Sequence, residues 1–185
     1  TVTMEKGSTI DASATQNGDG GKVVLWSDIT NEDSVTTVEG TILAKAGESS
    51  GDGGNIETSG SKVDFDNAII DASSQLGNSG LWLIDPDMPE ITVAGASSIA
   101  SNLNSQDIEY YDTTGDLTLQ NNAKIEYTGS SNTTLTLKTP NTIKFGSGSS
   151  ITSTSGKLNI ILWASYNKNR GGTIKIGVGE SDTVT

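Results

Sequence analysis

A sequence repeat that indicates the fold is clearest in residues 10–28, which read IDASATQNGDGGKVVLWSD. A short apolar segment leads through a turn of small polar residues into a second apolar segment. The same order returns in residues 42–60, ILAKAGESSGDGGNIETSG, and in residues 70–85, IDASSQLGNSGLWLID. A degenerate strand–turn–strand unit that recurs in this way is typical of a solenoid, in which each unit packs on the unit before it.

The second half of the chain repeats short alternating segments. Apolar and polar residues alternate in residues 116–119, 134–137, 158–161 and 173–176, and Ile125, Ile143 and Ile151 mark partner strands. Such alternation predicts half-buried strands. Residues 97–104 differ, because serines precede apolar residues spaced four apart. We predict a short helix there, followed by a strand over residues 108–111.

Two all-β architectures fit many short strands. A closed antiparallel sandwich needs tight hairpin turns of about two residues, whereas the intervals here are longer and the same strand types recur. We therefore predict an all-β parallel β-helix with about 20–25 residues per coil. Residues 1–88 form acidic coils and residues 89–185 more variable coils of one solenoid, with a seam at about 88–107. Because the chain begins and ends in strand-like sequence, we expect it to be a piece of a longer rod.

The charge is negative and unevenly distributed. The 185 residues hold 11 basic and 23 acidic side chains, a net charge of −12. Residues 1–112 carry a net −15, from 4 Lys and 19 Asp or Glu, whereas residues 113–185 carry a net +3. We expect no nucleic-acid partner for such a chain. The later section suits a mildly anionic ligand, or simply has a different solvated face.

The sequence offers few residues for catalysis. Cysteine and histidine are absent, which excludes disulfides, thiolate chemistry, Cys/His zinc sites and a histidine base. Two carboxylate pairs, Asp64 with Asp66 and Asp85 with Asp87, have the spacing that places side chains on one strand face. Phe65 is the expected inward residue, so the first pair is interpreted as solvated. We expect no enzymatic activity, no metal and no cofactor.

Turn residues have structural interpretations. Asp11 and Asp71 each precede a serine by two positions, which is typical of an aspartate that accepts hydrogen bonds from turn amides. The Gly-Asp-Gly-Gly turns at 18–21 and 51–54 invite comparison with calcium-binding β-rolls, but they lack tandem nine-residue repetition. Their glycine pairs are interpreted as positions of positive φ. The three tryptophans favour core or strand-end packing, with an exposed sugar-stacking platform as the alternative.

An ordered set of elements resembles a known family. Residues 20–28, 40–47, 51–60, 70–73 and 81–86 together resemble the large exoproteins of bacterial two-partner secretion, of the filamentous haemagglutinin and high-molecular-weight adhesin type. The resemblance implies a right-handed parallel β-helix that is exported through an outer-membrane transporter partner. It also implies adhesion at the surface of a Gram-negative bacterium. The Asn-Pro-Asn-Gly motifs of the family's secretion domain are missing from this sequence.

One loop and one sequon are candidate sites. Tyr166, Asn167, Lys168 and Arg170 combine an aromatic ring, an amide and two cations in a loop that ends in two glycines. This composition suits contact with a host-cell glycan or glycoprotein, including sialylated ones; an ordinary solvated turn is the alternative. Asn132 begins the only Asn-x-Ser/Thr sequon. It is a glycosylation candidate, because the resemblance includes glycosylated adhesins; a chance sequon is the alternative.

The sequence therefore predicts a secreted, surface-displayed adhesin fragment that presents contact loops on a rigid rod. A structural shaft with no binding site of its own, including one that delivers contact-dependent toxins, is the first alternative. A polysaccharide-active β-helix enzyme is the second.

Overall fold

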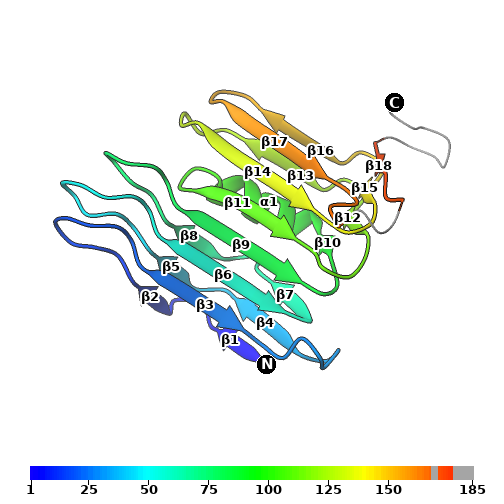
Figure 1. Cartoon of the computed structure of the whole chain (residues 1–185), viewed down its shortest axis with the longest axis horizontal. Helices are drawn as coiled ribbons and strands as arrows, with labels where there is room; N and C mark the ends of the chain where they lie inside the picture. The colour runs from blue at the N-terminus through cyan, green and yellow to red at the C-terminus, as the bar shows by residue number, and fades with distance from the viewer. Residues whose placement is uncertain (168–170, 177–185) are drawn as a thin grey trace.

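The fold is a parallel β-solenoid, as the repeats predict. The computed structural model describes residues 1–167 and 171–176. Every strand pair among them is parallel. Within each sheet, strands from successive coils lie side by side, so the chain proceeds along one axis coil by coil (Figure 1). The prediction of a parallel β-helix is confirmed, and the sandwich alternative is wrong.

Each coil contributes three elements, one to each face of the solenoid. The first three coils are β1 (Val2–Met4), β2 (Thr9–Asp11) and β3 (Lys22–Trp26); β4 (Val35–Val38), β5 (Thr41–Leu43) and β6 (Asn55–Gly60); and β7 (Lys62–Asp64), β8 (Ile69–Asp71) and β9 (Leu81–Pro86). The next three are β10 (Glu90–Ile91), α1 (Val93–Asn102) and β11 (Asp107–Tyr111); β12 (Leu117–Leu119), β13 (Lys124–Tyr127) and β14 (Thr133–Lys138); and β15 (Ile143–Phe145), β16 (Ser150–Ser153) and β17 (Leu158–Trp163). β18 (Ile174–Lys175) adds one more strand beside β15.

One face is a continuous six-stranded sheet, which we call the long sheet. Its strands lie in the order β17-β14-β11-β9-β6-β3 and face the viewer in Figure 1. Pairing continues from β9 to β11 across the predicted seam at residues 88–107. The long sheet is therefore a surface that runs unbroken along these coils.

The coils are longer than predicted. Asn55 pairs with Leu81 and Leu81 with Asp107, so each of these two intervals is one full turn of the solenoid. The first strands of the first two coils, β1 and β4, were not predicted, whereas a strand around Asp64, where β7 ends, was expected. In β4 the inward residue Thr36 is polar yet fully buried, which hides the apolar alternation. The segments at β12 and β14 resemble successive copies in the sequence, whereas they lie on different faces of one coil.

The core is a narrow stack of inward side chains. Val23, Ile56, Trp82, Ile108 and Leu135 lie in register on successive strands of the long sheet, and all are buried. Burying one such side chain contributes roughly 1.5–3 kcal/mol. The same layer repeats at each strand spacing, so the stack stiffens the solenoid along its axis.

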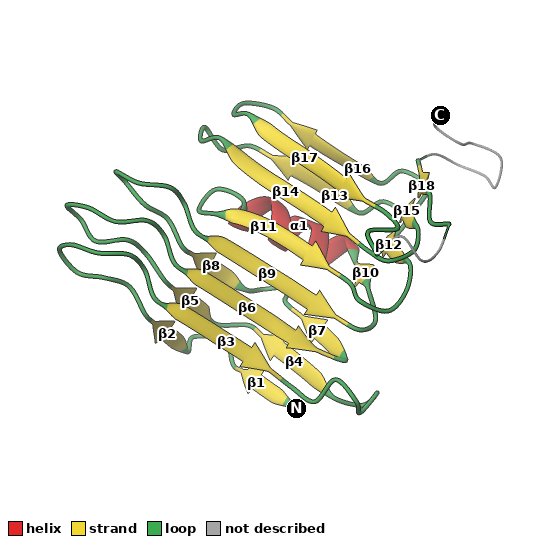
Figure 2. Cartoon of the chain, viewed as in Figure 1, coloured by secondary structure: helices red, strands yellow, loops and turns green. Residues whose placement is uncertain are grey.

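A helix replaces a strand in the fourth coil. α1 lies where the strand between β8 and β13 is expected (Figure 2). Its N-cap is Thr92, whose Oγ1 accepts a hydrogen bond from the Gly95 amide at 2.8 Å. The predicted helix is confirmed, although it begins at Val93, earlier than the serine pattern indicates.

The helix satisfies the strand edge that it covers. The side chain of Asn102 accepts a hydrogen bond from the Ile70 amide at 2.8 Å and donates one to the Ala68 carbonyl at 2.9 Å. The Gln106 side chain accepts a hydrogen bond from the Ala72 amide at 3.1 Å. These amide side chains take over hydrogen bonds that a strand backbone would make, so the edge is not left unpaired.

The glycine pairs serve close backbone stacking rather than positive φ. The prediction of positive φ for Gly20, Gly21, Gly53 and Gly54 is wrong, because the positive-φ glycines among the described residues are Gly7, Gly18, Gly51 and Gly148. A Cβ on Gly53 would collide with the Ala72 carbonyl, and one on Gly20 with the Ala44 carbonyl. Successive coils therefore approach too closely at this corner for any side chain.

Candidate functional site

The outward side of the long sheet carries an aligned row of side chains, which we call the aromatic column. Strand register places its members on consecutive strands, and Asp85 lies beside Tyr111 because the preceding pair is Ile84 with Tyr110. From β3 to β17 the column consists of Trp26, Ser59, Asp85, Tyr111, Lys138 and Trp163. Period-two alternation turns all six away from the core.

Aromatic rings gather at the β17 end of this column, in what we call the aromatic cluster. Its members are Tyr111, Lys138, Trp163 and Tyr166. The Tyr111 hydroxyl donates a hydrogen bond to the Tyr166 hydroxyl at 2.9 Å. The Tyr166 ring centroid lies 5.4 Å from that of Tyr111 and 6.4 Å from that of Trp163. Trp163 remains 51% exposed, so the cluster leaves about half of this side chain open to solvent.

The turn after β17 positions Tyr166. Ser165 adopts a φ of 55°, in the left-handed region that is common in tight turns. The Ser165 amide donates a hydrogen bond to the Asn141 carbonyl at 3.1 Å, and the Tyr166 amide donates to the Thr139 carbonyl at 3.4 Å. The preceding coil therefore anchors the turn, and the ring of Tyr166 returns over the long sheet.

Lys138 lies at the centre of the cluster. Its Nζ is 4.2 Å from the ring centroid of Tyr111, 5.0 Å from that of Tyr166 and 5.2 Å from that of Trp163. The same ammonium is 3.6 Å from a carboxylate oxygen of Glu109. Each cation–π contact contributes about 0.5–1 kcal/mol at such partly exposed positions. The ammonium group thus holds the rings together and has its own charge compensated.

The cluster borders an acidic stretch of the same face. Partial burial, together with the nearby carboxylates of Asp87, Glu57, Asp112 and Glu109, raises the pKa of Asp85 to about 6. The hydrogen bond to Tyr166 raises the pKa of Tyr111 to about 12, with further contributions from burial and from Asp85. Asp85 is therefore partly protonated in mildly acidic solution, which allows its carboxyl group to donate as well as accept hydrogen bonds.

The predicted loop residues differ in their placement. Tyr166 belongs to the aromatic cluster, and Asn167 follows it in the same turn with an exposed side chain. Lys168 and Arg170 lie outside the described residues. Tyr111 and Lys138 were not predicted from the sequence, since only the strand register brings them beside Tyr166. The sequence signal that could have found them is their position at the ends of segments in which apolar and polar residues alternate.

The tryptophans divide between the two interpretations. Trp82 is completely buried, and its Nε1 donates a hydrogen bond to Thr58 Oγ1 at 3.2 Å. Trp26 and Trp163 are 60% and 51% exposed. Core packing is therefore correct for Trp82. Trp26 and Trp163 each end a strand, so their exposure is compatible with strand-end packing and with a stacking platform.

Asn132 lies in an exposed turn directly before β14. The third residue of its sequon, Thr134, is partly buried, and its amide donates a hydrogen bond to Asp107 at 2.8 Å. The acceptor asparagine is accessible, and its glycosylation stays a prediction.

The acidic turn residues have the structural roles expected of them. Asp11 and Asp71 accept hydrogen bonds from the amides of Ser13 and Ser73 at 2.9 and 3.0 Å. Asp64 and Asp66 are exposed on either side of the buried Phe65. These predictions are confirmed.

The Gly-Asp-Gly-Gly turns stack on one another through their aspartates. Asp19 accepts a hydrogen bond from the Asp52 amide at 2.8 Å, and Asp52 accepts one from the Asn78 amide at 2.7 Å. Within residues 1–167 and 171–176 no group of three or more Asp or Glu side chains is arranged to hold a metal ion. The described contacts of these aspartates are thus those of inter-coil hydrogen bonding.

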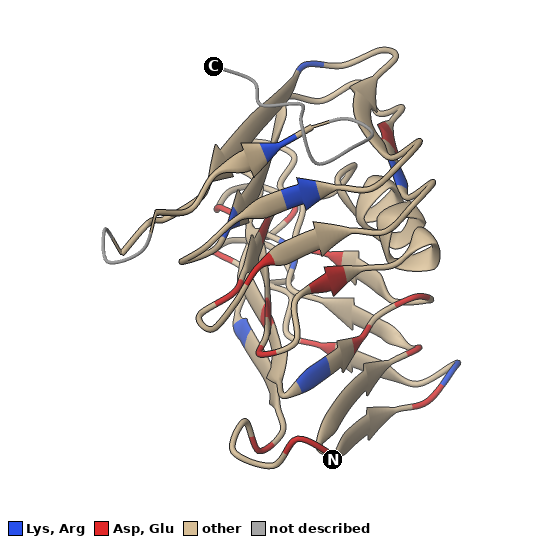
Figure 3. Ribbon diagram, turned by 90° about the vertical axis from the view of Figure 1, so that its right-hand side faces the viewer, with Lys and Arg blue, Asp and Glu red and all other residues tan. Residues whose placement is uncertain are grey.

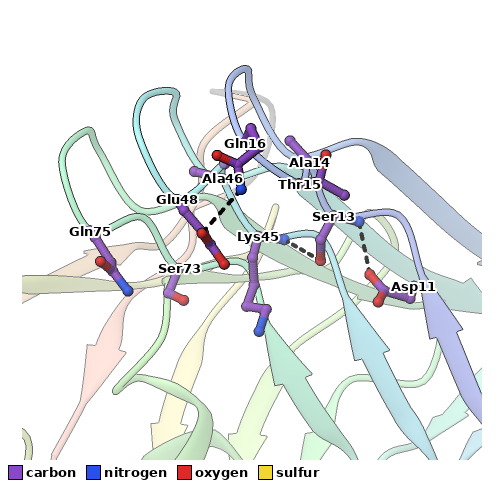
Figure 4. A pocket seen from close by; sticks show the side chains of 11 residues that line it. Asp11, Ser13, Ala14, Thr15, Gln16, Lys45, Ala46, Glu48, Ser73 and Gln75 are labelled. Atoms are coloured by element: carbon purple, nitrogen blue, oxygen red, sulfur yellow. Dashed lines mark hydrogen bonds between the residues drawn. The ribbon is translucent and has the colours of Figure 1, made fainter.

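A separate groove follows the corner loops between β2 and β3 and their equivalents in the next two coils. It has a volume of about 400 Å³ and is lined mainly by short polar side chains, with Lys45 between Ser13 and Ser73 (Figure 4). Gln16 donates a hydrogen bond to Glu48 across it at 3.3 Å. The described residues that line it include no aromatic side chain, so it is a weaker candidate for ligand stacking than the cluster.

Charge changes along the rod. The ribbon in Figure 3 is richest in acidic positions near the N-terminal coils and shows few of them in the last coils. The aromatic cluster lies near the boundary, with Glu109 and Asp85 on its β9 side and the uncharged strand β17 on the other. Its own surroundings are therefore acidic toward β9 and neutral toward β17.

Comparisons of the chain with protein-family models, with curated proteins and with solved structures find no match. Among the described residues, no helix is long and apolar enough to span a membrane. Function is therefore inferred from the residues and their geometry, together with the resemblance described above.

Proposed function

We propose that this chain is a glycan-contacting section of a surface-displayed bacterial adhesin. The solenoid is the scaffold, and the aromatic cluster on the long sheet is the contact. Host-cell glycans or glycoproteins are the partners. Export through an outer-membrane transporter and display on a Gram-negative cell belong to the same proposal, and they rest on the resemblance of residues 20–86 to two-partner secretion exoproteins.

The exposed ring of Trp163 beside Tyr166 is the observation that supports the proposal most. Sugar rings carry one apolar face of C–H bonds, which packs well against an aromatic face, while their hydroxyls need polar neighbours. Glu109, which lies 3.6 Å from Lys138, and the hydroxyls of Tyr111 and Tyr166 supply such groups at the cluster. Binding by presentation needs no catalytic step, and the proposal assigns none.

Attachment to epithelial cells tests the proposal. The purified chain should bind saturably, and Trp163→Ala should weaken binding about tenfold, since a central aromatic contact typically contributes more than about 1 kcal/mol. Leu76→Ala is the matched control, because Leu76 is 72% exposed on a corner loop away from the cluster. Sialidase-treated cells form a second arm, which shows whether the bound glycan is sialylated.

Failure of the wild-type chain to bind at tens of micromolar would contradict the proposal. An equal loss of binding in Trp163→Ala and Leu76→Ala would also contradict it, because binding would then not depend on the aromatic cluster. Release of saccharide product during the assay would contradict the absence of a catalytic step.

A structural shaft is the second candidate. The continuous stack from Val23 to Leu135 and the unbroken long sheet give rigidity without any ligand. A folded chain that binds neither cells nor isolated glycans would be a spacer, with receptor binding carried elsewhere.

A further inference from the structure

The aromatic column has an exposed ring at both ends of the long sheet. Trp163 marks the β17 end, and Trp26 marks the β3 end with 60% of its surface exposed. Five strand spacings separate them, which at about 4.8 Å each gives roughly 24 Å along the solenoid axis. A single sugar ring is much shorter than this distance, so one terminal sugar cannot contact both tryptophans.

The Trp26 end has a shallow recess of its own. A hollow of about 320 Å³ lies beside the indole and is lined also by Ser27, Asp28 and Ile29. It combines an aromatic ring with the carboxylate of Asp28, whereas the hydroxyl of Ser27 is buried. This is the same combination of apolar and polar groups that the aromatic cluster offers at the β17 end, so each end can hold one sugar unit.

The surface between the two tryptophans is low and polar. Ser59 is a small side chain, 2% exposed, whose hydroxyl donates a hydrogen bond to Glu57 at 3.1 Å. Asp85 is half-buried beside it. Tyr111 then begins the aromatic cluster. A ligand resting on the two end rings therefore passes over the buried Ser59, and the carboxyl group of Asp85 is the accessible hydrogen-bonding group of this column before the cluster.

The charges along this path disfavour an anion. Glu57, Asp85 and Glu109 lie on three consecutive strands of the path. Lys138 is the cation of the column, and it is already paired with Glu109 and surrounded by rings. Glu57 is likewise paired with Lys22, at 3.7 Å, so Asp85 is the carboxylate of the three without a described ion pair. An anionic chain would meet this carboxylate and no unpaired cation in the column, whereas neutral hydroxyls can donate hydrogen bonds to it.

We propose that the aromatic column binds a linear, neutral oligosaccharide that lies parallel to the solenoid axis, with one sugar stacked on Trp163 and a distant one on Trp26. This inference rests on the proposed function and deepens it by naming the ligand class and its direction. The interior sugars donate hydrogen bonds to Asp85 and its neighbours. Affinity should consequently depend on chain length.

The test measures dissociation constants for length series of linear neutral oligosaccharides, from disaccharide to octasaccharide, built on N-acetyllactosamine and on β-linked glucose. Wild-type affinity should rise at least tenfold from the shortest to the longest member of the series that binds. Trp26→Ala should abolish this gain and leave the shortest member unaffected. Trp163→Ala should weaken every member.

Ile69→Ala is the matched control, since Ile69 is 59% exposed, much like Trp26, but lies in β8 on a different face of the solenoid. It should keep the full gain with length. The same octasaccharides carrying a terminal sialic acid test the charge argument and should bind no better than the neutral ones.

Affinity independent of length, or a gain retained in Trp26→Ala, would overturn the inference while leaving attachment through Trp163 intact. Tighter binding of the sialylated chains would overturn the neutral ligand class. No binding of either series by a chain that still attaches to cells would overturn the inference alone. No binding to saccharides or cells would overturn the proposed function with it.

Discussion

Among single residues, two tryptophans that both follow a leucine point in opposite directions. Leu25-Trp26 and Leu81-Trp82 occupy similar places in the sequence repeat, yet Trp82 is in register with Val23 through Ile56 and points inward, whereas Trp26 points outward. A shift of one residue exchanges the two faces of a strand. The register of strands far apart in the sequence decides this, and the sequence alone left both orientations of tryptophan open.

Asp85 provides a prediction about pH. Its pKa in the folded protein is raised to about 6, above the usual value of an unfolded aspartate, so its ionisation opposes folding. The stability that comes from keeping this carboxyl group protonated is fully present below about pH 4. It is lost as the pH rises toward about 6 and the group ionises. Asp85→Asn should therefore match the wild type at pH 4 and be more stable by about 1 kcal/mol at pH 8, a figure reduced for solvent screening of a partly exposed group.

Denaturant unfolding of both proteins between pH 4 and pH 8 checks this expectation. Asp33→Asn, which removes an exposed carboxylate from the loop between β3 and β4, is the control. An Asp85→Asn variant whose stability changes with pH just as the wild type's does would show that burial of Asp85 carries no penalty.

At the scale of elements, the helix α1 shows how a solenoid tolerates an irregular coil. The serine and apolar pattern of residues 97–104 predicted a helix, because spacing of four is a local property. Its packing was not predictable from that pattern. Asn102 and Gln106 meet the edge of β8, which belongs to the preceding coil, and only the coil length brings these positions together.

Asn102 should be essential to this arrangement. Asn102→Ala leaves the buried Ile70 amide and Ala68 carbonyl without their partners, which should lower the free energy of unfolding by about 2–3 kcal/mol. Asn104→Ala, a matched change at an exposed position just beyond the helix, should lower it by less than about 0.5 kcal/mol. Equal effects in the two variants, measured by denaturant unfolding, would show that the amide side chain does not replace the missing strand.

At the scale of the whole molecule, the repeats of residues 10–85 were sufficient to predict the solenoid. The strands β1 and β4 were missed; in β4 the inward residue Thr36 is polar and fully buried, which hides the apolar alternation. The site was predictable only in part. Tyr166 stood out by composition, whereas Tyr111 and Lys138 join it through pairing of β11, β14 and β17.

The proposal requires that glycans bind on the outward face of the long sheet, through its exposed tryptophans. The three indole N–H signals in a nitrogen–proton correlation spectrum test it directly, because the buried Trp82 is an internal control. Titration with the longest neutral N-acetyllactosamine and β-glucose oligomers should shift the signals of Trp163 and Trp26 and leave that of Trp82 unchanged. Saturable binding without any shift at Trp163 would contradict the proposal.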